Sequence, residues 1–143
     1  MYTTEEKYLP FEIKVSNKPI IVVGMNPGRT RISKHSPYVW DGDTPTSNLL
    51  RKIVKPYTNI VLTNVCNYQD MSTKNVDEGM NDLAKMFKDI KPRKVICLGA
   101  YAHLAVRVLD PKCEIRKFLH PSYVVRFKKD KEEYTSKIRK ELE

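Results

Sequence analysis

The stretch Ile20-Ile21-Val22-Val23-Gly24-Met25-Asn26-Pro27-Gly28 decides the fold of this chain. It opens as a run of apolar, mostly β-branched residues, which is typical of a buried parallel strand covered on both faces. Proline removes a backbone donor and glycine widens the allowed backbone geometry, so Asn-Pro-Gly ends the strand in a tight turn. Asn26 is therefore expected at the carboxyl end of the strand, where ligands bind in open α/β sheets. Taken alone, the tripeptide also fits a plain turn signal.

Length and composition indicate one globular domain over residues 1–143. Hydrophobic residues make up 41% and charged residues 30% of the chain, which excludes a disordered tail and a membrane protein. No apolar run approaches the roughly 20 residues that a membrane span needs. Residues 1–7 lack the basic and then apolar pattern of a signal peptide. We therefore expect an intracellular protein of the cytoplasm, nucleus or nucleoid.

The charge balance favours a polyanionic partner. The formal net charge is +9 and the pI is about 9.5, which places nucleic acid first among candidate partners. Cys66, Cys97 and Cys113 are widely spaced and form no Cys-x-x-Cys pair. Zinc and iron–sulfur sites need closer ligand spacing, so we predict no metal and no cofactor.

Apolar runs alternate with amphipathic or charge-rich stretches along the chain. The expected strands cover residues 19–24, 59–65, 94–98 and 114–119, and the expected helices cover residues 48–54, 76–90, 101–109 and 123–143. This order predicts an α/β three-layer sandwich with a central four-stranded parallel sheet and helices on both faces. Residues 1–18 are expected to form an N-terminal arm.

Three polar side chains are expected to converge at the carboxyl ends of these strands. Asn26 follows the first strand, Asn64 lies near the end of the second, and His120 follows the fourth. An amide matches the donor and acceptor edge of a pyrimidine, and a histidine donor can stabilise an anion on a leaving group. A second amide can position an attacking water. The set suits cleavage of an N-glycosidic bond, in which the base leaves as an anion.

A long loop over residues 29–45 combines cations with aromatic side chains. Arg29 and Arg31 precede Tyr38 and Trp40, a mixture that suits phosphate contact together with base stacking. Trp40 is the only tryptophan in the chain. It can stack on a ligand, or it can anchor the loop on the core.

Four segments, in order, resemble the motifs of the uracil-DNA glycosylase superfamily. They are Gly24-Met25-Asn26-Pro27-Gly28, Leu62-Thr63-Asn64-Val65, Leu98-Gly99-Ala100-Tyr101-Ala102 and His120-Pro121-Ser122-Tyr123-Val124-Val125-Arg126. The first resembles the form found in the single-strand-selective monofunctional and mismatch-specific branches, and the others resemble the thermostable bacterial and archaeal branch. The resemblance implies a glycosylase-like fold and a monofunctional enzyme of base-excision repair. Such an enzyme, expected here to be monomeric, removes uracil or a related deaminated base flipped out of DNA.

The resemblance also implies roles for individual residues. Asn26 would position the water or the developing sugar cation, and His120 would donate to the carbonyl oxygen of the leaving base. The base site would be formed by Asn64, with Trp40 or in its place Tyr38 stacking on the base, and by Gly24 and Met25. The DNA contacts would come from Arg29, Arg31, Ser122 and Arg126, with Val124 or Val125 as the wedge that holds the gap open.

The chain also departs from the family pattern. The cysteines that bind an iron–sulfur cluster in the thermostable branch are absent. Asn26 stands where that branch has a carboxylate, and an amide cannot act as a general base. Gly28 replaces the tyrosine that excludes thymine in the most uracil-selective branch, so selectivity against a 5-methyl group is expected to be loose. The alternative is a weak or inactive module of the same fold that binds DNA or a protein partner.

Overall fold

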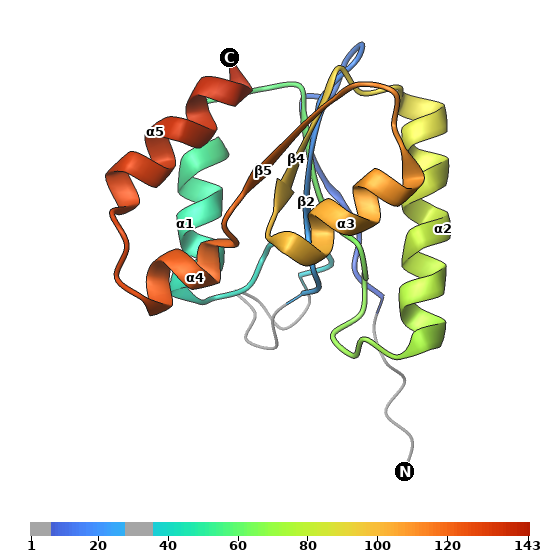
Figure 1. Cartoon of the computed structure of the whole chain (residues 1–143), viewed down its shortest axis with the longest axis horizontal. Coiled ribbons are helices and arrows are strands. Elements are labelled where there is room, and N and C mark those ends of the chain that lie inside the picture. The colour runs from blue at the N-terminus through green and yellow to red at the C-terminus, as the bar shows by residue number, and fades with distance from the viewer. Residues whose placement is uncertain (1–6, 28–35) are drawn as a thin grey trace.

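A five-stranded mixed sheet forms the centre of the molecule (Figure 1). The computed structural model describes residues 7–27 and 36–143. The strands are β1 (Phe11–Ile13), β2 (Ile20–Gly24), β3 (Ile60–Asn64), β4 (Lys94–Leu98) and β5 (Glu114–Phe118), in the order β1-β3-β2-β4-β5. The four predicted strands are present, and all pairs among them are parallel. The α/β fold expected from the sequence is therefore confirmed.

The strand count is corrected from four to five, because part of the expected arm joins the sheet. Strand β1 pairs antiparallel with β3, with Phe11 opposite Leu62 and Ile13 opposite Ile60. Phe11 and Ile13 also pack on the adjacent core cluster. Three residues are too few to show an alternating pattern, so this strand depends on the tertiary contact with β3.

Five helices within the described ranges cover the two faces of the sheet. They are α1 (Pro45–Val54), α2 (Thr73–Ile90), α3 (Ala100–Leu109), α4 (Pro121–Arg126) and α5 (Lys131–Leu142). Helices α1, α4 and α5 pack on one face, and α2 and α3 pack on the other (Figure 1). Every residue of β2, β3 and β4 is buried, as expected for parallel strands enclosed between two helical layers.

The predicted C-terminal helix is two helices separated by a turn. Helix α4 ends at Arg126 with Phe127 as its C-cap, and Lys128 takes a left-handed conformation with φ 51°. Asp130 then caps α5, since its carboxylate accepts hydrogen bonds from the backbone N–H groups of Glu132 and Glu133. The mixed charges of this segment conceal the break, and the aspartate cap is the sequence signal that marks it. None of the helices in the described ranges is long and apolar enough to cross a membrane.

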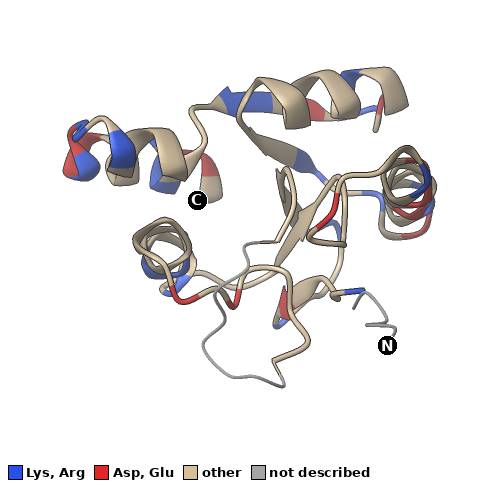
Figure 2. Ribbon diagram, turned by 90° about the horizontal axis from the view of Figure 1, so that it is seen from below, with Lys and Arg blue, Asp and Glu red and all other residues tan. Residues whose placement is uncertain are grey.

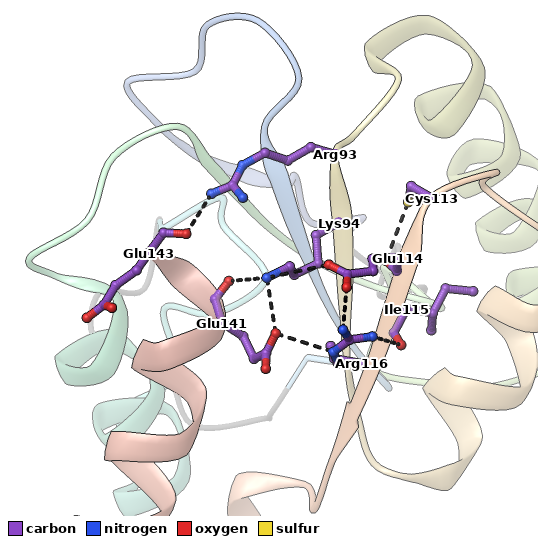
Figure 3. Close-up of polar contacts among 8 residues, drawn as sticks. All are labelled: Arg93, Lys94, Cys113, Glu114, Ile115, Arg116, Glu141 and Glu143. Atoms are coloured by element: carbon purple, nitrogen blue, oxygen red, sulfur yellow. Dashed lines mark hydrogen bonds and ion pairs between the residues drawn. The ribbon is translucent and has the colours of Figure 1, made fainter.

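A charged cluster fastens α5 to the amino ends of β4 and β5 (Figure 3). Lys94 is only 9% exposed, and its Nζ donates to the backbone oxygen of Glu141 at 2.9 Å and to its Oε1 at 3.0 Å. Arg116 reaches the same carboxylate, with Nε 3.4 Å from Glu141 Oε1. The cluster lies at the end of the strands opposite Gly24 and Asn64.

We expect Lys94→Ala to lower the free energy of unfolding by about 1–3 kcal/mol, because it leaves the helix-end carbonyl of Glu141 without its donor and removes one of the two cations at the Glu141 carboxylate. Urea denaturation measures the change. The control is Lys137→Ala, since the exposed Lys137–Glu133 ion pair contributes only about 0–0.5 kcal/mol. Equal effects of the two substitutions would contradict a stabilising role for the buried cluster.

Candidate base-binding and catalytic site

The carboxyl ends of the parallel strands bring the candidate residues together, near α4 at the lower edge of Figure 1. Gly24 and Asn64 are direct partners in the β2–β3 register. The pairing continues past the strands, since Val65 N–H donates to Gly24 O and Cys66 N–H donates to Met25 O, both at 2.9 Å. The backbones of the first two motifs are therefore paired side by side as far as Met25 and Cys66.

His120 enters from the end of β5 and is held at the start of α4. Its Nδ1 accepts a hydrogen bond from Ser122 N–H at 3.1 Å and lies 2.7 Å from Ser122 Oγ. A ring nitrogen that accepts from a backbone N–H carries no proton, so the neutral ring has its proton on Nε2. Burial also lowers the pKa of His120 below its ordinary value of 6.5. His120 is therefore a neutral Nε2–H donor at neutral pH.

Two neighbours fix the backbone around His120. The Tyr134 hydroxyl of α5 donates to Leu119 O, the carbonyl just before His120. Gly99, at the end of β4, has φ +97°, and a Cβ at Gly99 would lie 3.3 Å from the Cβ of His120. A glycine is needed there because only glycine readily adopts that φ. Gly99 of the third motif thus packs closely against His120 of the fourth motif.

Asn64 is the most unusual polar side chain of the site. It is 2% exposed, and neither Oδ1 nor Nδ2 has a hydrogen-bond partner within the described part of the chain. Burying an amide without partners costs about 1–3 kcal/mol for each group. Such a group requires an explanation, and a ligand with a complementary donor and acceptor edge provides one.

Trp40 lies between these groups. Its Nε1–H donates to Thr63 O at 3.1 Å, and its ring stacks on His120 with centroids 6.0 Å apart and planes 29° from parallel. A Cβ on Gly24 would lie 2.5 Å from both Trp40 Cζ2 and Asn64 Oδ1. The tryptophan is 5% exposed and belongs to the core cluster on that face. It anchors its loop on the core at the site itself, whereas Tyr38 packs edge-on against Phe11.

Asn26 is held by a residue that the sequence reasoning missed. Its Nδ2 donates to Gln69 O at 2.7 Å, across 43 residues of chain. This bond fixes the orientation of the Asn26 amide. The neighbouring Met25 is 38% exposed. Arg51 was also missed, and its Nη1 donates to Trp40 O at 2.6 Å and to Gly42 O at 2.7 Å. Nothing in the local sequence pattern marks either Gln69 or Arg51.

Burial separates the two candidates for the wedge, Val124 and Val125: it rules out the first, and the second stays a prediction. Val124 is fully buried and packs α4 on the core, and Val125 is partly buried against the same cluster. Val124 therefore does not reach the surface as a wedge must. The exposed apolar side chains of this region are Leu119, Tyr123 and Phe127, which are 49%, 44% and 52% exposed.

Tyr123 and Phe127 form an aromatic pair flanked by cations. Their ring centroids are 4.5 Å apart. The Arg126 guanidinium lies 5.6 Å from the Phe127 centroid, and Lys129 Nζ lies 6.0 Å from the Tyr123 centroid. Exposed aromatic rings beside cations suit contact with bases and phosphates.

The other predicted DNA contacts are distributed differently. Ser122 is exposed on α4 and contacts His120, whereas Arg29 and Arg31 lie outside the described residues. Viewed from the side of the strand ends, basic and acidic residues are interleaved along the outer helices (Figure 2). The described ranges contain no group of three histidine, cysteine or acidic side chains placed to hold a metal ion.

One comparison with known proteins gives a match. A family model described as the uracil DNA glycosylase superfamily matches residues 10–143. A search of curated proteins found no match to the chain. The family match covers the sheet, all five described helices and every motif discussed above.

Proposed function

The chain belongs to the uracil-DNA glycosylase superfamily, and we propose that it is a monofunctional DNA glycosylase acting on uracil, or a related deaminated base, flipped out of DNA. The family match indicates a DNA-glycosylase-like function with DNA as the substrate. The finer proposal is supported by two groups that lie at the carboxyl ends of the parallel strands. They are the unpartnered amide of Asn64 and the Nε2–H of the neutral His120 ring.

In the proposed mechanism, Asn64 recognises the base. Its Nδ2 donates to a pyrimidine carbonyl while its Oδ1 accepts from the ring N–H, which satisfies both buried amide atoms at once. Because Asn64 is buried at the end of β3, only a base removed from the helical stack can reach it.

His120 stabilises the leaving group. When the bond between the sugar C1′ and the base nitrogen breaks, the electron pair stays on the base, and negative charge develops on its carbonyl oxygen. The Nε2–H of a neutral imidazole can donate to that oxygen without giving up its proton. Asn26, fixed by Gln69, holds a water beside C1′, and water addition to the sugar cation releases one proton to solvent.

The direct test is an excision assay with oligonucleotides that carry one uracil, hypoxanthine or thymine, single-stranded or opposite guanine or adenine. Alkali cleaves any abasic product, and the length of the labelled strand reports excision. We expect cleavage at uracil or another deaminated base. If DNA binds but is not cleaved at any of these bases, the glycosylase proposal is wrong and the protein is a DNA-binding module of the same fold.

The pH dependence of excision should follow His120. Since burial lowers the pKa of this histidine below 6.5, the neutral ring persists through the neutral range and is lost only in acid. Protonation adds a proton to Nδ1 and breaks the hydrogen bond from Ser122 N–H that orients the ring. We therefore expect the single-turnover rate to be flat near neutrality and to fall with a midpoint below pH 6.5. His103→Ala is the control, since the pKa of His103 is also lowered, by burial and by Lys117 and Arg107. If the midpoint of the acidic fall in rate shifts in His103→Ala, the titrating group is His103.

The aromatic pair on α4 should contribute to DNA binding. Tyr123→Ala and Phe127→Ala are each expected to weaken binding of single-stranded DNA about 5- to 50-fold, since base stacking on an aromatic ring contributes about 1–3 kcal/mol. Fluorescence anisotropy of a labelled oligonucleotide measures the change. Leu104→Ala removes an apolar side chain that is 64% exposed on α3 and should leave binding unchanged. Equal losses in all three variants would contradict a specific stacking role.

A further inference from the structure

The indole of Trp40 lies beside both residues that would hold the base. One face stacks on His120 at 6.0 Å between centroids. The edge at Cζ2 occupies the space beside Gly24, where the Asn64 Oδ1 also lies, because a single Cβ on Gly24 would be 2.5 Å from each atom. The ring therefore extends from one recognition group to the other.

The indole is also too enclosed to be an open stacking platform. Trp40 is 5% exposed and Asn64 is 2% exposed. A ring that receives a base must present a free face, and an amide that reads a base must present its edge. In the described conformation the indole has no free face and the Asn64 amide has no exposed edge.

Different groups hold the backbone and the side chain of Trp40. Arg51 holds the backbone carbonyl oxygens of Trp40 and Gly42, so the loop stays on α1. The indole has one hydrogen bond in the described structure, from Nε1 to Thr63 O at 3.1 Å. Rotation of the side chain would break that bond and uncover Asn64 without moving the loop.

We propose that Trp40 is the gate of the base site: its indole closes the space between Asn64 and His120, and a target base enters by displacing it. This inference rests on the proposed glycosylase function and deepens it by naming the residue that controls entry. The unpaired Asn64 amide beside the indole favours opening, because an entering base can satisfy both of its polar atoms.

The single tryptophan makes the gate measurable in the unmodified protein. Acrylamide quenching of its fluorescence is compared with and without a single-stranded oligonucleotide carrying 2′-fluoro-2′-deoxyuridine, whose fluorine slows glycosidic cleavage. A matched 2′-deoxycytidine oligonucleotide, whose base has an amine where uracil has a carbonyl, is the control, and anisotropy verifies that both are bound. We expect the quenching constant to rise at least about threefold with the uridine analogue and to stay nearly constant with deoxycytidine. Bound analogue with unchanged or reduced quenching would overturn the gate.

Substitution gives an independent readout. At subsaturating enzyme, Trp40→Leu is expected to raise the rate of uracil excision at least about threefold relative to Phe87→Leu. Phe87 is a buried aromatic residue on the opposite face of the sheet, so it controls for lost packing. A lower rate than the control would identify Trp40 as a stacking residue and overturn the gate. If Trp40→Leu does not fold, Trp40→Phe, which lacks the Nε1–H bond, tests the same direction.

The two proposals fail in different ways. If the protein excises a base but the quenching of Trp40 does not change, the gate is wrong and the glycosylase function stands. Absence of excision at every base tested removes the glycosylase function, and the gate with it.

Discussion

His120→Ala is expected to lower the single-turnover rate of base excision about 10²- to 10³-fold while DNA binding changes less than about threefold. The magnitude is that of removing one preorganised donor from a site where negative charge develops. The donor is Nε2–H, since Nδ1 accepts from Ser122 N–H. Binding should persist because the role proposed for His120 is at the flipped base rather than at the phosphates.

The same substitution also removes the N-cap of α4, which is expected to cost about 1 kcal/mol of stability. His120→Asn separates the two effects, because asparagine retains a capping oxygen but places no donor where Nε2 lies. We expect it to restore thermal stability and leave excision low. Excision that returns with the cap would show that His120 has a structural role, and parallel loss of binding and excision in His120→Ala would show the same.

Asn64→Asp is expected to lower uracil excision about 10- to 100-fold, because a well-matched amide pair contributes about 1–3 kcal/mol of base discrimination. The substitution replaces the Nδ2 donor by a carboxyl oxygen, and at 2% exposure the group would be strongly driven toward its protonated form. The proton of that form can lie on either oxygen, so the group can accept from the cytosine amine and donate to cytosine N3 as readily as it pairs with uracil, and relative activity on cytosine should rise. Single-turnover rates on matched uracil and cytosine oligonucleotides measure the change.

Asn67→Asp is the matched control for burial of a carboxyl group. Asn67 is 5% exposed, and its Oδ1 has no hydrogen-bond partner within the described ranges. It follows the same strand but lies outside the motifs. Similar losses of excision in the two variants would indicate a general effect of a buried acid. Unchanged base preference in Asn64→Asp would remove Asn64 from base recognition.

The sequence by itself determined the order of the elements and the place of the motifs. Continuous β-branched runs bury on both faces, so they predict parallel strands without knowledge of their neighbours. Parallel strands with helical crossovers place their carboxyl ends at one edge, which brings Asn64 and His120 to the same side. Strand β2 ends at Gly24, just before Asn26 and Pro27, where the local sequence predicts that the strand stops.

Tertiary structure decided which side chains face the site. Successive residues on a helix point about 100° apart, so the sequence of α4 does not say whether Val124 or Tyr123 is exposed. Packing against the core buries Val124 and leaves Tyr123 outside. The sequence leaves open whether Trp40 stacks on a ligand or anchors its loop, and the structure buries it in the core cluster and stacks it on His120. That contact joins residues far apart in the chain, and a local sequence pattern carries no information about such distant neighbours.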